Sequence, residues 1–382
     1  MSAILRQPIG AAVVGYGYWG PNLVRNLHEH PDFRLLGVCD LDEARIAELE
    51  RRHPGVPVER SFDALLLDPR VEAVAIATPP STHFALVSKA LEAGKHVLVE
   101  KPLATKTSDA EALAELAEQQ GLTLMPGHTF LYSPPVNKIR DLIAEGELGE
   151  VYFVTSTRMN LGKYQRDGVI CDLAPHDLSI LLHWLGGPIT DVAATGQAVF
   201  NSEVPETAFL SLGFAGGARA NLQVSWLAPR KLREIVIVGS RRMIQYNDAA
   251  GEDPVRIYDR GLDFDEAPES FGEYRLTYRT GDMVAPRIDA AEPLMLELQD
   301  FALAIREGVE PASNAKLGVE IVRTIEAAEL SMRLGGRPLA VDHSTDGAHP
   351  SLADVLAIGN GRRKQRSRAA LRPAVPVAAT GS

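Results

Sequence analysis

Three glycines in one short segment have the spacing that lets a polypeptide backbone approach a phosphate group. The segment Gly15-Tyr-Gly-Tyr-Trp-Gly20 follows the apolar run Ala11–Val14 and opens a helix-period segment with Leu23, Val24 and Leu27. A strand, a glycine-rich turn and a helix in this order form the phosphate-binding end of a dinucleotide fold. The alternative is a glycine-rich turn that binds no ligand.

Five residues of this loop are candidates for contact with a cofactor. Gly15 permits the tight turn, Gly17 lets the backbone approach a pyrophosphate, and Gly20 lets the helix pack closely on the strand. Tyr18 and Trp19 lie between the glycines and either shape the cofactor pocket or pack on the next helix. All five residues are predicted to bind the dinucleotide.

An aspartate ends the second apolar run, where the adenosine ribose of a dinucleotide would lie. The carboxylate of Asp40 would accept from the ribose hydroxyls and repel the extra 2′-phosphate of NADP. The sequence therefore favours NAD, with NADP not excluded. The alternative role for Asp40 is a cap on the helix that begins near Leu41, Asp42 and Glu43.

A lysine follows another apolar run, in the tripeptide Glu100-Lys-Pro102. In open α/β sheets, ligands bind beyond the carboxyl ends of the strands, so Lys101 is expected to point into the cofactor crevice. Its ammonium could hold a substrate oxygen and stabilise the alkoxide formed as hydride departs. Alone, the tripeptide could equally be a solvated turn.

An aspartate and a histidine stand four residues apart further along the chain. Because Pro175 is tolerated in a first helical turn, a helix is predicted to begin near Leu173, with Asp172 as its N-cap. His176 would share the face of Asp172, and the helix N-terminus would keep the imidazole neutral, as a base requires. The alternative is a capping aspartate beside a packed histidine.

Polar side chains between the later strands and this pair are candidates for substrate contacts. Arg158, Asn160 and Tyr164 are predicted to bind substrate together with Lys101, Asp172 and His176; the alternative is a surface loop.

The elements that position these residues fall into two patterns. Up to Gly127, apolar runs alternate with helix-period segments, which predicts a parallel sheet with crossover helices, an α/β Rossmann domain over residues 1–127. The expected strands are Ile9–Val14, Leu35–Asp40, Val71–Thr78, His96–Glu100 and Leu122–Met125, and the clearest helices are Thr82–Ala93 and Ser108–Gln120.

Two-residue alternation dominates after Gly127. In Ala218–Leu227 the apolar residues share one face, which is typical of an antiparallel sheet with one wet or partner-covered face. An α+β domain with a large, mostly antiparallel open sheet is therefore predicted over residues 128–341. Residues 342–382 contain few large apolar residues and a basic cluster, and are predicted to be a disordered tail or a binding site for an acidic partner.

Composition excludes several function classes. The net charge of −11 argues against nucleic-acid binding, and Cys39 and Cys171 are too few for a disulfide framework or a metal cage. No metal site is predicted. The sequence has neither a signal layout nor an apolar run that approaches a membrane span, so a cytoplasmic protein is expected.

Several motifs, in order, resemble the Gfo/Idh/MocA oxidoreductase family. They are Gly15–Gly20, Ala77-Thr-Pro-Pro-Ser-Thr-His83, Gly94-Lys-His-Val-Leu-Val-Glu-Lys-Pro102, Asp172-Leu-Ala-Pro-His-Asp177 and Glu292-Pro-Leu. The resemblance implies that Lys101 is the active-site lysine, with Pro102 often cis, and that Asp172 and His176 are an acid/base pair. It further implies that Thr78, Pro79, His83 and Glu100 line the nicotinamide side of the crevice and that the open sheet forms an oligomer interface.

The function predicted is hydride transfer between a nicotinamide cofactor and a secondary hydroxyl or ketone of a sugar, nucleotide sugar or cyclitol. Lys101, His176 and Asp172 are the predicted catalytic residues, and the partner predicted besides the substrate is a second copy of the chain, in a dimer or tetramer. Two alternatives stay open: an NAD-dependent glycoside hydrolase, and a non-catalytic regulator that senses the dinucleotide.

Overall fold

The structure is a computed structural model that describes residues 7–162, 167–200, 204–264 and 276–343. Two predictions fall outside the described residues: the substrate contact of Tyr164 and nearly all of the predicted tail.

The first sheet is parallel throughout and has the Rossmann order. Within the described ranges it has six strands in the order β3-β2-β1-β4-β5-β6. The strands are β1 (Ile9–Val14), β2 (Phe33–Cys39), β3 (Val58–Glu59), β4 (Ala73–Ile76), β5 (His96–Glu100) and β6 (Leu124–Gly127). The predicted α/β Rossmann fold is confirmed, with two of the predicted strands matching to the residue.

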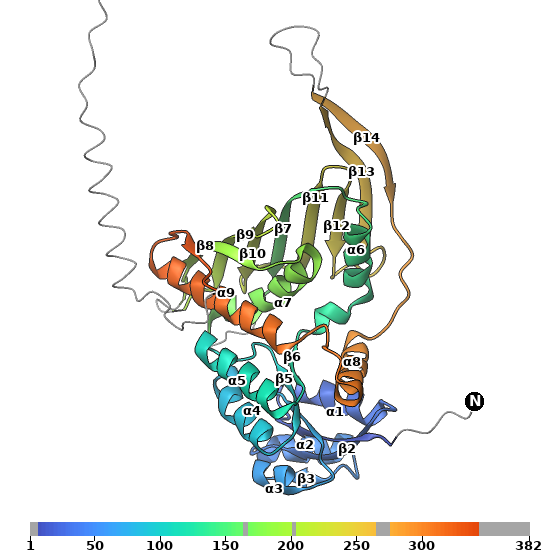
Figure 1. Ribbon diagram of the computed structural model, residues 1–382, viewed down its shortest axis with the longest axis vertical. Helices are drawn as coiled ribbons and strands as arrows, with labels where there is room; N and C mark the ends of the chain where they lie inside the picture. Colours follow the sequence, from blue (N-terminus) through green and yellow to red (C-terminus); the bar gives the residue numbers. More distant parts are fainter. Residues whose placement is uncertain (1–6, 163–166, 201–203, 265–275, 344–382) are drawn as a thin grey trace, which may run out of the picture. The chain divides into compact units, whose positions relative to one another are not determined.

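Helices cover both faces of this sheet (Figure 1), which is why all six residues of β1 are buried. These helices are α1 (Gly20–Glu29), α2 (Glu43–Arg52), α3 (Phe62–Leu67), α4 (His83–Glu92) and α5 (Thr107–Gln120), with a 3₁₀ turn η1 (Pro80–Thr82) before α4. Helix α5 ends as predicted at Gly121, whose φ of +65° is the left-handed conformation that terminates many helices.

The second sheet is mixed and mostly antiparallel. Its nine strands within the described ranges run in the order β14-β13-β12-β11-β7-β10-β9-β8-β15, and only β7 and β10 pair in parallel. The strands are β7 (Val151–Met159), β8 (Ile189–Gln197), β9 (Thr207–Phe214), β10 (Arg219–Ser225), β11 (Leu232–Gly239), β12 (Met243–Asn247), β13 (Val255–Phe264), β14 (Leu276–Val284) and β15 (Leu339–Ala340). This confirms the predicted second fold class.

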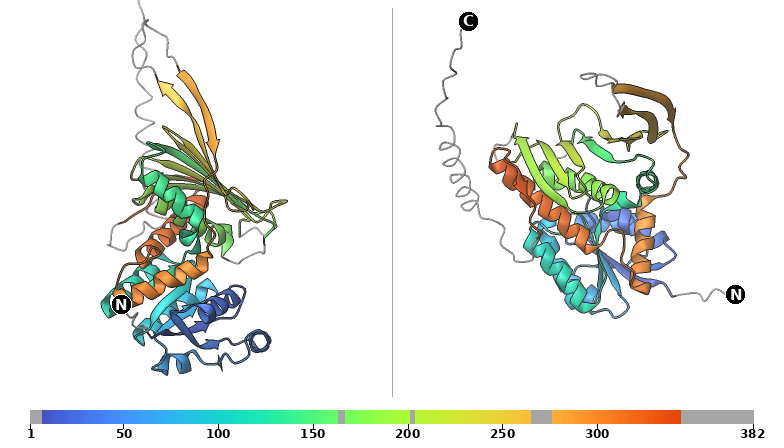
Figure 2. Two further views of the ribbon diagram at one scale, coloured as in Figure 1. Left: turned by 90° about the vertical axis from the view of Figure 1, so that its right-hand side faces the viewer. Right: turned by 45° about the horizontal axis from the view of Figure 1, so that its top comes forward.

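The remaining helices pack on the inner face of the mixed sheet or on the parallel sheet. They are α6 (Pro134–Ala144), α7 (Gly168–Leu185), α8 (Pro293–Glu307) and α9 (Ala315–Arg333), with the 3₁₀ turn η2 (Thr129–Tyr132) before α6. Helices α7 and α9 lie along one face of the mixed sheet (Figure 2). Helix α8 instead places Leu294, Leu298 and Phe301 in the same apolar core as β1 and α1. The domain limits given from the sequence stay a prediction.

The start of α7 differs from the prediction. The helix begins at Gly168 rather than near Leu173, its N-cap is Asp167 rather than Asp172, and Pro175 lies inside it. The extra turn forms because Val169 and Ile170 are buried in the apolar core of the mixed sheet, and this burial offsets the cost of an interior proline.

No helix in the described part of the chain is long and apolar enough to cross a membrane. The same residues contain no grouping of histidine, cysteine and acidic side chains that could hold a metal ion.

Candidate active site

The predicted site residues of the first sheet meet at its carboxyl edge. The glycine loop follows β1, the segment with Thr78 and Pro79 follows β4, and Lys101 follows β5. Because β1, β4 and β5 are parallel neighbours, these three connections lie side by side. This edge is where ligands bind in open α/β sheets.

The glycine loop has the shape of a phosphate cradle. Gly15 has a φ of +95°, and a Cβ there would lie 2.6 Å from the carbonyl oxygen of Ala77. A Cβ on Gly20 would collide with the carbonyl oxygen of Gly15, so both positions require glycine. A Cβ on Gly17 would meet only the side chain of Arg45, at 3.5 Å, which leaves the backbone accessible to a ligand.

Helix α1 begins at this cradle, and no side chain caps its N-terminus. Tyr18 in the loop is 96% exposed, whereas Trp19 packs against the core that α8 completes. The indole Nε1 of Trp19 is buried and has no hydrogen-bond partner within the described residues. An open glycine cradle and an uncapped helix N-terminus fit the pyrophosphate of a dinucleotide.

Asp40 is tied to the glycine loop by hydrogen bonds. Its Oδ2 accepts from the backbone N–H of Tyr16 at 2.6 Å, and its Oδ1 accepts from that of Asp42 at 2.8 Å. The cap of α2 is Asp42, which accepts from the N–H of Ala44, so Asp40 is not the helix cap. Arg45 lies 3.6 Å from Asp40 and is half-exposed; sequence reasoning missed it, although an arginine near this aspartate is a signal for a 2′-phosphate site.

Lys101, which follows β5 of the parallel sheet, contacts helix α7. The peptide bond between Lys101 and Pro102 is cis, as the family resemblance implied. The ammonium Nζ donates to the backbone carbonyl of Asp172 at 2.7 Å and lies 3.4 Å from its Oδ1. The other carboxylate oxygen of Asp172 accepts from the indole N–H of Trp226 at 2.9 Å. The structure thus brings Lys101 and Asp172 together and adds Trp226, which sequence reasoning placed only on an apolar face.

The interior proline of α7 removes a helical hydrogen bond close to the carbonyl that Lys101 contacts. Pro175 has no N–H, so the carbonyl of Cys171 lacks the helical hydrogen bond that residue 175 would otherwise donate. The neighbouring carbonyl of Asp172 is the one that accepts from Lys101.

His176 lies one turn beyond Asp172, but the two side chains are not hydrogen-bonded. The ring nitrogens of His176 have no hydrogen bond within the described residues, and the ring packs edge-on against Phe130, with centroids 5.2 Å apart. Burial holds the pKa of His176 well below its ordinary value, assisted by the charge of Lys101 and other cations. This lowered pKa favours the neutral imidazole that the sequence predicted. The predicted cause, a helix N-terminus, is wrong because the helix begins at Gly168, two turns before His176.

Several buried ionisable groups lie near Lys101 and Glu100. Burial raises the pKa of Glu100 to about 7, although the charge of Lys101 opposes this shift. Burial and the nearby Glu100 raise the pKa of Glu297, which accepts a hydrogen bond from Thr129 at 2.8 Å. Burial also lowers the pKa of His128 to about 3, and neither of its ring nitrogens has a partner among the described residues. Of these groups, the sequence pointed only to Glu100.

His83 lies behind the crevice rather than on its surface. Its Nδ1 is 2.8 Å from the carbonyl oxygen of Pro102, and its Nε2 is 2.9 Å from that of Thr78. The side chain is completely buried, so the expectation that it lines the nicotinamide side is corrected: it links the ends of β4 and β5. Thr78 shares a 2.7 Å hydrogen bond with Thr82, and Pro79 leads into η1.

Of the two described candidates for substrate contacts, Arg158 differs from the prediction and Asn160 does not. Arg158 lies on β7, is 4% exposed, and forms a two-pronged ion pair with Asp177, so it belongs neither to a surface loop nor to an open binding surface. Asn160 follows β7, and its side-chain oxygen is buried with no partner in the described part of the chain. A Cβ on Gly162 would lie 2.9 Å from that oxygen and 2.8 Å from Trp226, which places Asn160 near the site.

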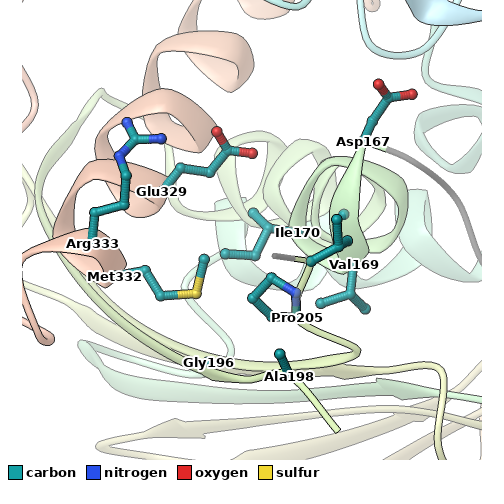
Figure 3. A pocket seen from close by; sticks show the side chains of 11 residues that line it. Asp167, Val169, Ile170, Gly196, Ala198, Pro205, Glu329, Met332 and Arg333 are labelled. Atoms are coloured by element: carbon teal, nitrogen blue, oxygen red, sulfur yellow. The ribbon is translucent and has the colours of Figure 1, made fainter. Parts of the chain in front are cut away.

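A cavity of about 410 Å³ lies on the flank of α7 and contains none of the predicted site residues. Figure 3 shows Glu329, Met332 and Arg333 of α9 on one side and Val169 and Ile170 of α7 on the other. The predicted catalytic residues gather at Lys101 and not at this cavity.

The comparisons agree with the geometry. Residues 9–128 match the oxidoreductase family with an NAD-binding Rossmann fold, and residues 136–245 match the GFO/IDH/MocA C-terminal domain. The UDP-N-acetylglucosamine 3-dehydrogenase of Acidithiobacillus ferrooxidans is 33% identical over 60% of this chain and 70% of its own length. The NADP-dependent scyllo-inositol 2-dehydrogenase IolW of Bacillus subtilis is 26% identical over 84% of this chain and 92% of its own.

A solved structure extends the likeness to almost the whole of both chains. The crystal structure of GenD2 from gentamicin A biosynthesis, in complex with NAD, has a TM-score of 0.75 and 26% identity, and the match covers 90% of this chain and 99% of that one. The predicted NAD(P)-dependent dehydrogenase is confirmed at the level of enzyme class. The chain belongs to the Gfo/Idh/MocA family of NAD(P)-dependent oxidoreductases, as both family matches, the glycine cradle and the strand-end lysine show.

Proposed function

We propose that this enzyme interconverts a secondary alcohol and a ketone on a sugar, a nucleotide sugar or a cyclitol, with NAD as the preferred cofactor. The observation that carries the proposal is the contact of Lys101 with Asp172. Asp172 lies one helical turn before the imidazole of His176. Relatives named as a UDP-N-acetylglucosamine dehydrogenase and an inositol dehydrogenase support the substrate class.

The proposed site residues divide the work between them. Gly15, Gly17 and Gly20, with the N-terminus of α1, would hold the pyrophosphate, and Asp40 would face the adenosine ribose. The nicotinamide, when bound, supplies the chemistry of hydride acceptance and donation.

Lys101 would hold the reacting oxygen with its ammonium and stabilise negative charge on it. In the oxidation direction the carbon–hydrogen bond breaks as a hydride, the hydroxyl proton passes to the neutral ring of His176, and a ketone remains. We assign Asp172 a different task from the one expected from the sequence: it fixes Lys101, because its carboxylate and carbonyl contact Lys101 and not His176.

The test is a screen of the purified full-length protein against UDP-sugars, free sugars and inositols, with NAD and NADP in parallel. We expect NADH to form with members of one of these classes. Hydrolysis of an aryl glycoside without net NADH would support the glycosidase alternative. Tight NADH binding with no turnover on any member would contradict the proposal and support a regulator.

A further inference from the structure

The ion pair of Arg158 lies directly beside the proposed base. Arg158 Nε donates to Asp177 Oδ2 at 2.8 Å, and Nη2 donates to Oδ1 at 3.0 Å. The two side chains are 4% and 2% exposed. Asp177 directly follows His176 on α7, so this pair fixes β7 to the helical turn that carries the imidazole.

An aromatic ring connects Arg158 to His176. The guanidinium carbon of Arg158 lies 4.7 Å from the ring centroid of Phe130, and the same ring packs at 74° against His176. A second guanidinium, that of Arg233, lies 5.6 Å from the Phe130 centroid. Cation–π and edge-to-face contacts both have preferred geometries, so the place of Arg158 determines where the His176 ring can lie.

The charges around His176 come from several elements. Lys101 after β5, Arg158 on β7, Arg233 on β11 and His128 after β6 all disfavour the imidazolium form. The acidic neighbours are already engaged, in that Asp177 pairs with Arg158, Asp248 pairs with Arg233, and Asp172 contacts Lys101 and Trp226.

One nitrogen of Arg158 takes no part in the ion pair. Its Nη1 is buried and has no hydrogen-bond partner within the described residues, whereas Nε and Nη2 bond to Asp177. The buried guanidinium is poorly screened by water, so its charge contributes to the lowered pKa of the neighbouring imidazole.

We propose that Arg158 is a positioning residue of the active site, which acts on His176 through the ring of Phe130 and through its own charge. The proposal replaces the substrate contact predicted for Arg158 from the sequence. It rests on the proposed function for its catalytic consequence, but its effect on the imidazole can be measured without turnover.

The experiment follows the imidazole of His176 directly. The full-length protein is labelled with ¹⁵N-histidine, its ring signals are recorded between pH 5 and 9 without substrate, and His176→Gln assigns the signal. The double variant Arg158→Met/Asp177→Asn removes both charges of the pair, so that no unpaired charge stays buried. We expect the midpoint of His176 to lie below its ordinary value in the wild type and to be higher in the double variant, because the charge of Arg158 is one of the contributions that lower it.

Two controls make the shift specific. Arg219→Met/Asp191→Asn removes a comparable pair on the same sheet that is half-exposed, and should leave the His176 signal unchanged. Arg158→Lys keeps the charge but loses the planar fork, so the midpoint should stay low while kcat falls. If the Met/Asn variant does not fold, Arg158→Gln/Asp177→Asn offers an uncharged pair of amides that can bond to each other.

Kinetics then separate this inference from the proposed function. Because a base must be neutral, the acidic limb of the kcat/KM profile should move to higher pH in the double variant. An unmoved His176 midpoint in both charge-removing variants overturns the inference, whatever their activity. A raised midpoint with an unmoved pH profile supports the action of Arg158 on the imidazole and overturns the role of His176 as the base.

Discussion

The two sheets of this enzyme deliver side chains to the crevice by different means. At the parallel sheet, site residues follow the carboxyl ends of β1, β4 and β5, and backbone geometry sets their place. At the mixed sheet, Asp172 and His176 lie within helix α7, and side chains from other elements decide what each can do. A strand-end site is therefore recognisable in a short segment of sequence, whereas a site inside a helix depends on partners far along the chain.

The largest effects should come from removing the one catalytic group that each region is proposed to supply. Lys101→Met and His176→Ala should each lower kcat by roughly 10²–10⁴, the range for a lost acid or base group. NADH affinity, measured by fluorescence titration, should change little because the glycine loop supplies the cofactor contacts. Near-normal turnover in both variants would mean that the active site lies elsewhere.

The glycine cradle should be sensitive to one added methyl group. Gly20→Ala would force a Cβ against the carbonyl oxygen of Gly15, and such overpacking costs about 1–3 kcal/mol of stability. We expect at least tenfold weaker NADH binding by the same titration, with a lower Tm. Gly216→Ala is the matched control, since nothing lies within 4 Å of its added Cβ. Equal NADH affinity in the two variants would argue against a pyrophosphate at this loop.

The role of the mixed sheet in fixing Asp172 can be tested through Trp226. Trp226→Phe keeps an aromatic ring and removes the 2.9 Å hydrogen bond to the carboxylate. A hydrogen bond to a charged group is worth about 1.5–3 kcal/mol, so we expect kcat to fall by roughly tenfold to a hundredfold. Trp184→Phe removes an indole bond to the carbonyl of Val136 and should affect Tm but not kcat. Equal losses of kcat in the two tryptophan variants would mean that Trp226 has only a structural role.

Substitution of Asp40 at the parallel sheet should have a smaller effect, on the preference between NAD and NADP. Asp40→Ser should narrow the kcat/KM gap between NAD and NADP by about fivefold, since repulsion between charges 4 Å apart in water is about 1 kcal/mol. Asp42→Ser, two residues on, is the control, because serine still caps α2. A wild-type preference for NADP would contradict the role given to Asp40 and would assign the dominant effect to Arg45.

The smallest effect is expected at the end of the chain. Truncation after Val341 should leave Tm and turnover unchanged, because residues 342–382 have few large apolar side chains to bury. Thermal unfolding and an activity assay of the shortened protein check this. A drop of many degrees in Tm would show that the segment docks on the rest of the chain or on another copy.

The sequence by itself determined the parallel sheet and its loop. Glycine spacing after an apolar run, a lysine after another run, and helices that end at glycine are local signals, because backbone conformation depends on a few adjacent residues. Two-residue alternation likewise determined the class of the second sheet, although β8, β12, β13, β14 and β15 were not predicted.

Only the tertiary structure decided what the polar residues do. A proline read locally predicted a helix start at Leu173, but burial of Val169 and Ile170 placed Pro175 in the interior. Arg158 and His83 read as possible ligand contacts, yet both are buried and paired. Partners such as Trp226 and Phe130 come from distant segments, and no local pattern records them. The charge state and hydrogen bonds of a buried side chain depend on whatever the fold packs around it.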